Sequence, residues 1–430
     1  DAVRTYDVMD REIHDAATKA WDAVVKLGER NGFRNAQASV LAPTGCLTGD
    51  TMVTTDRGLQ RLSEIGDVWG AKWQDLSMQV ATDEGAREAT KFFVNGEEPT
   101  RLVTTEAGYR IQGTLAHRIK VVDQITGAWV WKRMADVTPG DLVPLQLDTL
   151  VGAPRSVPLP VLDQAYYAGD RSLVVPERVD TELAELVGYF MGDGSLHAKG
   201  IRLCVADSDP DVAERIAVLS KGLFNLTPVV RQQAGYQEVT LQSVRLARWW
   251  QAAGFAKDLP GVDHAGKGWT PRVPSTVLET NDRSVYRAFL RGLFEADGTV
   301  LEGVPSVATS SESFAGELRS LMLALGYPTT TRETVSGFGG EIHVLRLRNI
   351  RHAIRFGSEV GFLGGRKAAA VATHASAQSG NRERIHLPES VWLEVVPIGH
   401  DLRDLVRQAV SRGRGLSRDL AEQVESATVV

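Results

Sequence analysis

Two aspartates end two similar apolar segments, and together they could hold a metal ion. Asp193 and Asp297 lie 104 residues apart, and a glycine follows each. Carboxylates that come together repel each other unless a cation neutralises them. Oxygen ligands favour Mg²⁺, which can activate water and stabilise a leaving oxygen in phosphodiester hydrolysis. We therefore expect Asp193 and Asp297 to be catalytic residues and metal ligands rather than two unrelated helix caps.

A second group of residues could carry out chemistry on the chain itself. Cys46 lies in the sequence Gly-Cys-Leu-Thr-Gly-Asp, and Thr114 and His117 follow 68 and 71 residues later. A thiol that attacks the preceding carbonyl converts an amide into a thioester. His117 could protonate the departing amide nitrogen while Thr114 holds the peptide in a distorted geometry. The alternative is a buried thiol and an ordinary core imidazole.

Two helices must bring the aspartates together. Small residues recur at four-residue spacing before each aspartate, at Ala184, Gly188 and Gly192 and at Ala288, Gly292 and Ala296. Such a stripe lets two helix backbones approach closely, so we expect these helices to pack on each other. The glycine after each aspartate suits a helix end.

The same order of elements follows both helices, which indicates an internal repeat. Each half continues with short strands, a helix, two β-runs around a glycine turn, and a last helix that ends before a Gly-Phe pair at Gly254 or Gly361. The predicted middle helices and β-runs cover residues 211–224 and 229–241 in the first half and 312–325 and 330–347 in the second. Two similar halves predict one pseudo-twofold α/β domain.

The composition excludes a membrane protein and a disulfide scaffold. Of 430 residues, 43% are hydrophobic and 24% charged, and no apolar run approaches the roughly 20 residues that a membrane helix needs. Two cysteines, Cys46 and Cys204, cannot build a disulfide framework. We expect a reducing, cytoplasmic compartment and no membrane partner. The net charge of −6 leaves room for a local basic face.

The two aspartate segments resemble a known family of DNA-cutting enzymes. Leu186-Val-Gly-Tyr-Phe-Met-Gly-Asp-Gly194 and Leu290-Arg-Gly-Leu-Phe-Glu-Ala-Asp-Gly298 are similar to the paired motifs of the LAGLIDADG homing endonucleases, over roughly residues 181–370. The resemblance implies hydrolysis of double-stranded DNA with Mg²⁺ at Asp193 and Asp297, and β-strands that lie in the major groove. Intein members of the family often carry a lysine where this sequence has Pro271. Arg272 or Lys267 could substitute for it, and we take both as candidate DNA-binding residues.

A basic stretch further along the chain supports DNA as a partner. Between Arg346 and Arg418 there are 13 Lys and Arg against 6 Asp and Glu. Such an excess suits phosphate contacts, although it also fits the solvated face of arginine-rich helices. Our candidate DNA-binding residues here are Arg346, Arg348, Arg366 and Lys367.

The surroundings of Cys46 resemble the N-terminal splicing blocks of inteins. The match includes Thr114-Leu-Ala-His117 and a later block at Val137–Pro144, and it spans residues 46 to about 145. The resemblance implies a hedgehog/intein (HINT) β-unit that splices itself, with Cys46, Thr114 and His117 as catalytic residues. An endonuclease inserted downstream is the usual intein arrangement. Its DNA target would then be the intein-free host allele.

The residues before Cys46 identify a candidate host. Residues 32–45 resemble an adenosylcobalamin-dependent (class II) ribonucleotide reductase near its substrate-phosphate loop. We expect adenosylcobalamin to serve only the intact host, a ribonucleoside-diphosphate reductase. Reductase activity of this chain itself has no support, because 45 residues hold neither the radical-generating cysteines nor a cobalamin domain.

The predicted fold class is therefore multidomain. We expect a short helical extein fragment at 1–45, the N-terminal part of an all-β HINT unit at 46–145, and a linker at 146–180. An α/β pseudo-twofold LAGLIDADG domain follows at 181–375, and then a basic, partly helical segment at 376–430. The helix of the first segment is expected over Asp10–Arg30 and that of the last over residues 401–425.

One expected motif is absent from the sequence. Intein splicing ends at a His-Asn dipeptide, and none occurs here. We therefore expect the C-terminal intein and extein segments to be missing partners of this chain. The competing hypothesis is an autoprocessing HINT module with a DNA-binding but inactive endonuclease insert. It shares Cys46, Thr114 and His117 but does not predict two Asp-Gly helices.

Overall fold

The computed structural model describes residues 45–162, 172–258, 270–335 and 340–374 without interruption. Shorter described pieces lie within 15–26 and 384–424, and those within 15–26 are helical. The rest of the predicted helix Asp10–Arg30 lies outside the described residues. The chain divides into two units, Asp1–Thr44 and Gly45–Val430. Within the described residues no helix combines the length and the apolar character needed to cross a bilayer.

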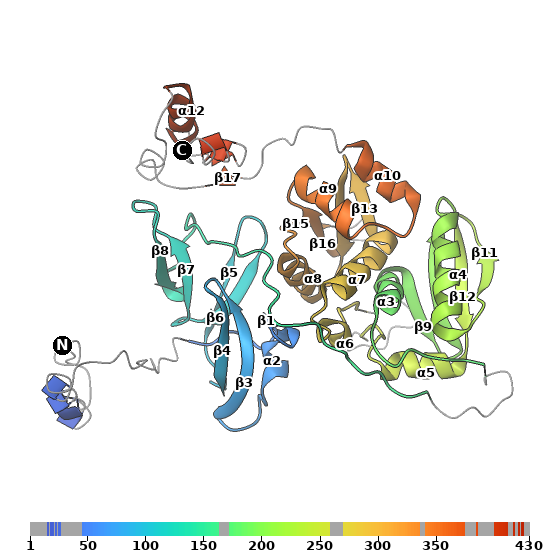
Figure 1. The fold of residues 1–430 in the computed structure, drawn as a ribbon, viewed down its shortest axis with the longest axis horizontal. Helices are drawn as coiled ribbons and strands as arrows, with labels where there is room; N and C mark the ends of the chain where they lie inside the picture. The colour runs from blue at the N-terminus through green and yellow to red at the C-terminus, as the bar shows by residue number, and fades with distance from the viewer. Residues whose placement is uncertain are drawn as a thin grey trace. The chain divides into compact units, whose positions relative to one another are not determined.

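The first hundred residues of the second unit consist largely of short antiparallel strands. Four strands make one sheet in the order β2-β1-β3-β4, and two further pairs are β5-β6 and β7-β8 (Figure 1). A small separate core contains Ile119, Val121, Met134 and Val137. The elements are β1 Met52–Thr55, β2 Gly58–Arg61, α2 Leu62–Ile65, β3 Trp73–Thr82, β4 Gly85–Phe93, β5 Thr100–Thr104, β6 Arg110–Thr114, β7 Arg118–Val122, β8 Trp129–Arg133 and η2 Met134–Asp136.

Two halves with the same order of elements follow, as the repeat predicts. The first half contains α3 Thr181–Asp193, β9 Gly194–His197, β10 Gly200–Ala206, α4 Pro210–Phe224, β11 Val229–Gln232, β12 Tyr236–Gln242 and α5 Val244–Ala252. After α6 Ser275–Leu278, the second half contains α7 Arg283–Ala296, β13 Gly298–Leu301, β14 Val304–Thr309, α8 Glu312–Ala324, β15 Thr329–Val335, β16 Glu341–Leu347, α9 Ile350–Glu359 and α10 Gly365–Thr373. Their sheets have equivalent strand orders, β9-β10-β12-β11 and β13-β14-β16-β15.

Each of these sheets has one buried face and one open face. On β10, Ile201, Leu203 and Val205 are buried in the main core, whereas Arg202 and Cys204 between them are only partly covered. Because side chains alternate along a strand, the open residues form a continuous outer face on each sheet.

Polar side chains fix where the helices begin. The Asp180 carboxylate accepts a hydrogen bond from the backbone N–H of Leu183 at the start of α3, and Asp282 accepts one from Ser284 at the start of α7. A side-chain acceptor at this position satisfies a backbone donor that has no partner within the helix. The two long helices therefore start at equivalent capped positions.

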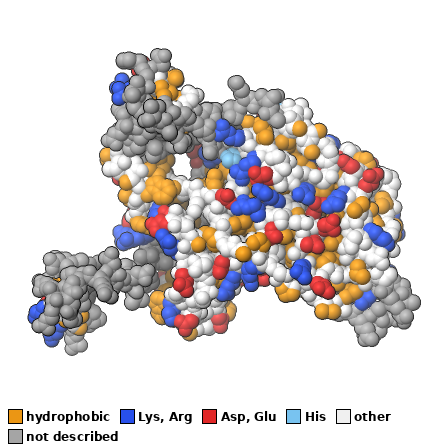
Figure 2. Space-filling view, in the orientation of Figure 1, with side chains coloured by type: hydrophobic (Ala, Val, Ile, Leu, Met, Phe, Trp, Pro, Cys, Tyr) orange, Lys and Arg blue, Asp and Glu red, His pale blue; other side chains and the backbone are white. Residues whose placement is uncertain are grey.

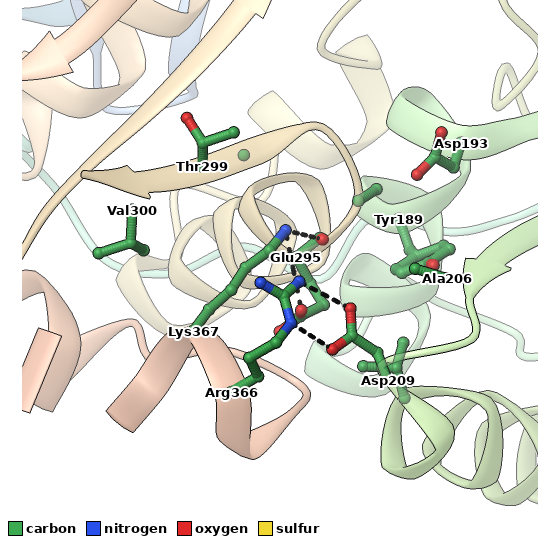
Figure 3. Close-up of a pocket in the computed structure, with 12 residues that line it drawn as sticks. Tyr189, Asp193, Ala206, Asp209, Glu295, Thr299, Val300, Arg366 and Lys367 are labelled. Atoms are coloured by element: carbon green, nitrogen blue, oxygen red, sulfur yellow. Dashed lines mark hydrogen bonds and ion pairs between the residues drawn. The ribbon is translucent and has the colours of Figure 1, made fainter. Parts of the chain in front are cut away.

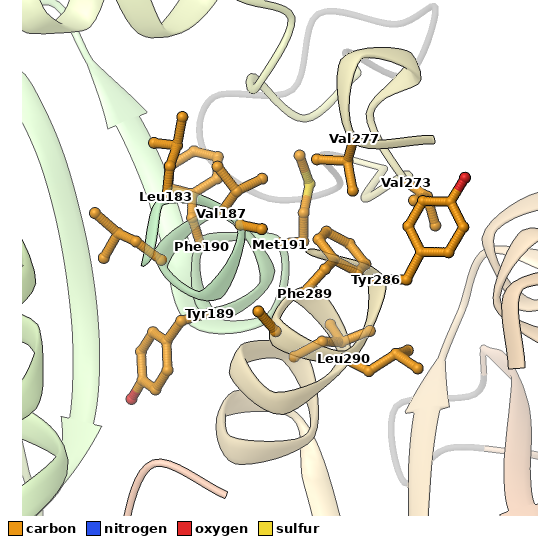
Figure 4. Packing of buried hydrophobic residues seen from close by; sticks show 14 of the residues in the cluster. Leu183, Val187, Tyr189, Phe190, Met191, Val273, Val277, Tyr286, Phe289 and Leu290 are labelled. Atoms are coloured by element: carbon orange, nitrogen blue, oxygen red, sulfur yellow. The ribbon is translucent and has the colours of Figure 1, made fainter. Parts of the chain in front are cut away.

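The helices α3 and α7 pack closely against each other in the core, and glycines make this contact possible. A methyl group on Gly188 would lie 2.0 Å from the carbonyl oxygen of Phe289, and one on Gly292 would lie 2.0 Å from that of Glu185. Large apolar side chains surround this contact, including Val187, Phe190 and Met191 of α3 and Phe289 and Leu290 of α7 (Figure 4). The predicted close packing through small residues is confirmed.

The glycines after the two aspartates do not have the left-handed backbone that was expected at a helix end. Gly194 has an extended backbone with φ of −100° rather than a left-handed one. A Cβ there would lie 2.5 Å from the carbonyl oxygen of Phe190, and one on Gly298 would lie 2.2 Å from that of Phe294. Close approach to the preceding turn, rather than positive φ, therefore requires glycine at both positions.

Two further expectations need correction. The segment predicted as a linker at 146–180 packs into the main core in its described parts, through Val157, Leu159, Leu173 and Val179. The predicted helix at 401–425 is interrupted, since α12 spans His400–Ser411 and the short strand β18 Leu416–Ser417 pairs with β17 Arg384–Ile385, while residues 420, 421, 423 and 424 are helical again. Glycines at 413 and 415 in the sequence interrupt the helical pattern there.

The contact between α3 and α7 yields a stability prediction. Gly292→Ala should lower the free energy of unfolding by about 2–3 kcal/mol, because the added methyl group forces the two backbones apart. Gly222→Ala is the matched control, since a Cβ at that α4 glycine meets nothing nearer than Glu182 Oε2 at 3.8 Å. Alanine there should be neutral or should stabilise by up to about 1 kcal/mol. Urea unfolding measures both; equal effects would contradict the close packing.

Candidate functional site

Asp193 and Asp297 meet at one end of the packed helices. A methyl group on Gly192 would lie 3.2 Å from Cγ of Asp297, so the Asp297 carboxyl group lies over the last turn of α3, next to Asp193. The close backbone contact at the preceding glycines sets this position. The structure therefore places the predicted pair together.

The electrostatics of the pair oppose its fully ionised state. Burial raises the pKa of Asp193. Burial and the neighbouring Asp193 carboxylate raise the pKa of Asp297 to about 6. Both residues keep one side open to solvent, so the desolvation comes from the protein around their other sides. Charged carboxylates that are desolvated beside each other gain strongly from a bound positive charge.

Two lysines lie at the ends of the two helices. Lys367 was predicted only as a DNA-binding residue, and Lys257 was not predicted. Lys257 Nζ donates to the carbonyl oxygen of Gly192 at 2.6 Å. Lys367 Nζ donates to that of Phe294 at 3.1 Å and also to that of Glu295. Burial lowers the pKa of both lysines. Each lysine therefore binds the C-terminal carbonyls of one aspartate-bearing helix, where a cation also matches the helix dipole.

Lys257 is a third candidate for the lysine expected at Pro271, beside Arg272 and Lys267. It follows Gly254 by three residues, and Lys367 follows Gly361 by six, so a lysine after each Gly-Phe pair was the overlooked sequence signal. Arg272, proposed as a substitute, instead donates to the carbonyl oxygen of Gly254 at 3.2 Å. Lys267, the other substitute, lies outside the described residues.

A pocket of about 360 Å³ extends from Asp193 between the two halves (Figure 3). Asp209 accepts two hydrogen bonds from Arg366, at 2.6 and 2.8 Å. Asp211 accepts one from the backbone N–H of Gly365 at 2.7 Å. These contacts fasten the start of α10 in the second half to the start of α4 in the first half.

The predicted DNA-binding residues have varied surroundings. Arg366 is engaged with Asp209, and Lys367 is 5% exposed, so both are tied to the protein. Arg346 lies on the outer face of the second sheet, where it donates to the carbonyl oxygen of Leu301 at 3.1 Å. Arg348 follows the end of β16 and is partly covered. Acidic and basic side chains are interspersed on the face shown in Figure 2, so no single basic patch covers it.

The outer sheet faces add basic residues that charge counting missed. Arg202 on β10 and Arg231 on β11 lie on the outer face of the first sheet, and Arg332 on β15 lies on that of the second. Only Arg202 had a sequence signal, since it alternates with the buried apolar residues Ile201 and Leu203.

The residues around Cys46 form a second site. The backbone N–H of Cys46 donates to Thr114 Oγ1 at 2.9 Å, and His117 Nδ1 lies 3.2 Å from the carbonyl oxygen of Gly45. Gly45 has a φ of +101°, and a Cβ there would lie 2.2 Å from the backbone nitrogen of His117. Thr114 and His117 thus contact the two ends of the peptide group between Gly45 and Cys46.

The Cys46 thiol is not pre-ionised in this arrangement. Burial raises its pKa, and the Glu98 carboxylate adds to the shift. A thiol of this kind needs its proton removed during attack, so its reactivity would depend on the position of the peptide group rather than on a stable thiolate.

Comparison with known proteins identifies one part of the chain. Residues 284–361 match the family described as LAGLIDADG-like domain. They comprise most of α7 and the elements from β13 to α9. The family model thus matches residues 284–361, within the second half of the repeat, where the second Asp-Gly motif lies.

Curated relatives match different lengths of the chain. The replicative DNA helicase DnaB of Rhodothermus marinus is 26% identical over 382 residues, which cover 85% of this chain and 37% of the helicase. The vitamin B12-dependent ribonucleotide reductase of Streptomyces avermitilis is 56% identical over 59 residues, 14% of this chain and 6% of the reductase. The chain spans about two fifths of the length of the helicase relatives.

Among solved structures, the homing endonuclease I-DmoI in complex with DNA and Mn is 17% identical. The similarity covers 42% of this chain and 96% of that protein, with a TM-score of 0.31.

The residues at the helix ends fit a hard divalent cation. Asp193 and Asp297 supply oxygen ligands from the ends of two packed helices, and burial raises the pKa of both carboxyl groups. The lysines stabilise carbonyl groups, so the carboxylates remain available for a metal. Mg²⁺ or Mn²⁺ suits this donor set.

The raised pKa values predict how metal binding depends on pH. Binding requires deprotonated carboxylates, so Mn²⁺ affinity should be constant well above pH 6 and fall at least about tenfold per pH unit well below it. Lys257→Met removes a cation that lowers the pKa of both aspartates, so the midpoint should move to higher pH. Electron paramagnetic resonance of free Mn²⁺ measures this. Lys221→Met, on the exposed side of α4, should leave the midpoint unchanged; equal midpoints in all three proteins would contradict the role of Lys257.

Proposed function

We propose that this chain carries an intein with a LAGLIDADG homing endonuclease, inserted in a vitamin B12-dependent ribonucleotide reductase. The observation that carries the endonuclease part is the meeting of Asp193 and Asp297 at the end of the glycine-packed helices. The proposed activities are site-specific double-strand cleavage of DNA and self-splicing.

In the endonuclease, the two helix ends would act on the two strands of DNA. A divalent cation, when bound, would supply activation of water and charge stabilisation at the scissile phosphates. Asp193 and Asp297 would hold it. Lys257 and Lys367 would hold the helix ends in place and add positive charge beside the phosphates. The outer-face arginines Arg202, Arg231, Arg332 and Arg346 would contact the DNA backbone and base edges.

In the splicing reaction, the Cys46 Sγ would attack the carbonyl carbon of Gly45. The bond between that carbon and the Cys46 nitrogen breaks as the thioester forms, and the thiol proton is balanced by protonation of the amine that leaves. His117 lies at the peptide group and could donate this proton, while Thr114 Oγ1 holds the Cys46 nitrogen. Two groups that hold one peptide bond from both ends favour this step.

The two kinds of curated relative support a composite chain. A reductase matches a short segment with high identity, while a helicase of unrelated activity matches most of the chain with low identity. An element inserted into different hosts would produce this pattern. The alternative is an autoprocessing HINT module with a DNA-binding but inactive endonuclease insert, which differs from our proposal in lacking both splicing and DNA cleavage.

DNA cleavage tests the endonuclease proposal. With Mg²⁺, the wild-type chain should cut a supercoiled plasmid that carries the reductase gene without the intein around the Leu41–Gly45 codons, and it should spare the interrupted gene. Asp193→Asn or Asp297→Asn should each abolish double-strand cutting while binding stays equal or slightly tighter, because a negative charge beside phosphate is lost. Gel electrophoresis and gel shifts across a salt series measure the two properties.

Controls separate an inactive site from a wrong assignment. Asp404→Asn changes an exposed α12 carboxylate and should cut normally. Because Lys257 occupies the site, Pro271→Lys should bring no gain. Binding without cutting by the wild type would favour the inactive insert, and cutting by both aspartate variants would refute the proposed site.

Thiol-induced cleavage tests the splicing proposal. Dithiothreitol should slowly release residues 1–45 by attacking the thioester, as mass spectrometry can show. Cys46→Ala should abolish release and His117→Ala should slow it strongly. Thr114→Ser keeps the hydroxyl group and should retain more activity than Thr114→Ala. Equal release from the Cys46→Ala protein would exclude this nucleophile.

A further inference from the structure

Three side chains that can bind metal lie together on the second sheet, far in sequence from both aspartates. Glu333 lies on β15, while Glu341 and His343 lie on β16, and one donor atom from each lies within 4.8 Å of the others. Glu333 and His343 are direct partners across the ladder. Glu341 lies two residues from His343 and therefore on the same face. Two adjacent strands thus present three donors to one point.

This face is opposite to the face that carries Arg332 and Arg346. His343 is 4% exposed, whereas the nearby Val335 is 71% exposed, so the cluster lies where the buried side of the sheet emerges into solvent. It also adjoins the β-rich part of the chain, since Arg110 of β6 forms an ion pair with Glu333. The cluster is therefore separate from the proposed DNA-facing surfaces.

The charged side chains around this cluster favour the binding of a cation. Arg110 pairs with both Glu312 and Glu333, so one guanidinium serves two carboxylates. Glu341 forms no ion pair within the part of the chain that the structure describes. His343 Nδ1 lies 3.8 Å from Glu333 Oε1, which is too long for a hydrogen bond. Three carboxylates face two arginines here, because the charge of Arg319 also acts on Glu333, so this corner keeps a small excess of negative charge beside an available imidazole.

We propose that Glu333, Glu341 and His343 form a divalent-cation site suited to Zn²⁺. An imidazole with two carboxylates favours Zn²⁺ over Mg²⁺, which prefers oxygen alone. Ligands about 2.0–2.1 Å from a tetrahedral Zn²⁺ lie about 3.3–3.4 Å apart, so the donors need to move by only about an ångström or so. Both glutamates are exposed and can make this adjustment. Arg110 keeps Glu312 as a partner when Glu333 turns to the metal.

The bound ion would join β15 to β16 near the loop end of their hairpin. An ion that binds only the folded protein stabilises it in proportion to the logarithm of its concentration over the dissociation constant. The site would therefore be structural, and Zn²⁺ should raise the unfolding temperature without any requirement for DNA.

The test uses the full chain with Cys46→Ala, Asp193→Asn and Asp297→Asn, which removes the competing thiol and carboxylate pair. Equilibrium dialysis at pH 7.5 should show a Zn²⁺ site whose affinity falls at least tenfold in Glu341→Gln and in His343→Gln. Glu88→Gln, which changes an exposed carboxylate on β4, is the matched control and should bind as before. Zn²⁺ should raise the unfolding temperature of the reference and control proteins more than that of Glu341→Gln.

Because Glu341 is exposed, Glu341→Gln should fold even if His343→Gln does not. The test can then be decided on Glu341→Gln alone. Unchanged Zn²⁺ affinity in Glu341→Gln, confirmed as folded by circular dichroism, would overturn the proposal. Absence of any Zn²⁺ binding by the reference protein would do the same.

Discussion

The backbone contact between α3 and α7 is the constraint on which the rest of the α/β part depends. Gly188 and Gly292 leave no space for a side chain at the crossing, so the rotation and register of the two helices are fixed together. Asp193 and Asp297 then meet at the shared end, where desolvation and mutual repulsion oppose their charged forms. The surrounding apolar core offsets this electrostatic cost, and a bound cation would relieve it.

Local patterns in the sequence predicted most of this architecture. The small-residue stripes identified the helix contact, and the repeat identified both sheets, because these signals depend on residues close together in the chain. Lys257 was missed because the expected lysine was sought at Pro271, whereas Lys257, three residues after Gly254, donates to Gly192 at the end of α3. The segment at 146–180 was read as a linker from its prolines, although Val157 and Leu159 pack into the core.

The count of basic residues between Arg346 and Arg418 was a poor guide to the DNA-binding residues for a different reason. It treats every cation as free, but Arg366 pairs with Asp209, which lies 157 residues earlier. Only the contact between the two halves makes this pair, so no local signal reveals it. The same holds for the second site, where Cys46, Thr114 and His117 meet because Leu47 and Gly113 form an isolated bridge. The resemblance to intein motifs predicted that these three residues meet, because neither the hydrophobic periodicity nor the composition of the sequence indicates it.

The small core of Ile119, Val121 and Met134 supports this site and is separate from the main core. The two proposed activities could therefore be lost independently.

The most direct test of the central claim is a double-mutant cycle for Mn²⁺ binding at the aspartate pair. Dissociation constants would be measured for the wild type, Asp193→Asn, Asp297→Asn and the double variant. If the carboxylates share their metal, each single substitution should weaken binding nearly as much as both together, with a coupling energy of at least about 1 kcal/mol. Losses that simply add would contradict a shared site and leave two aspartates that act independently.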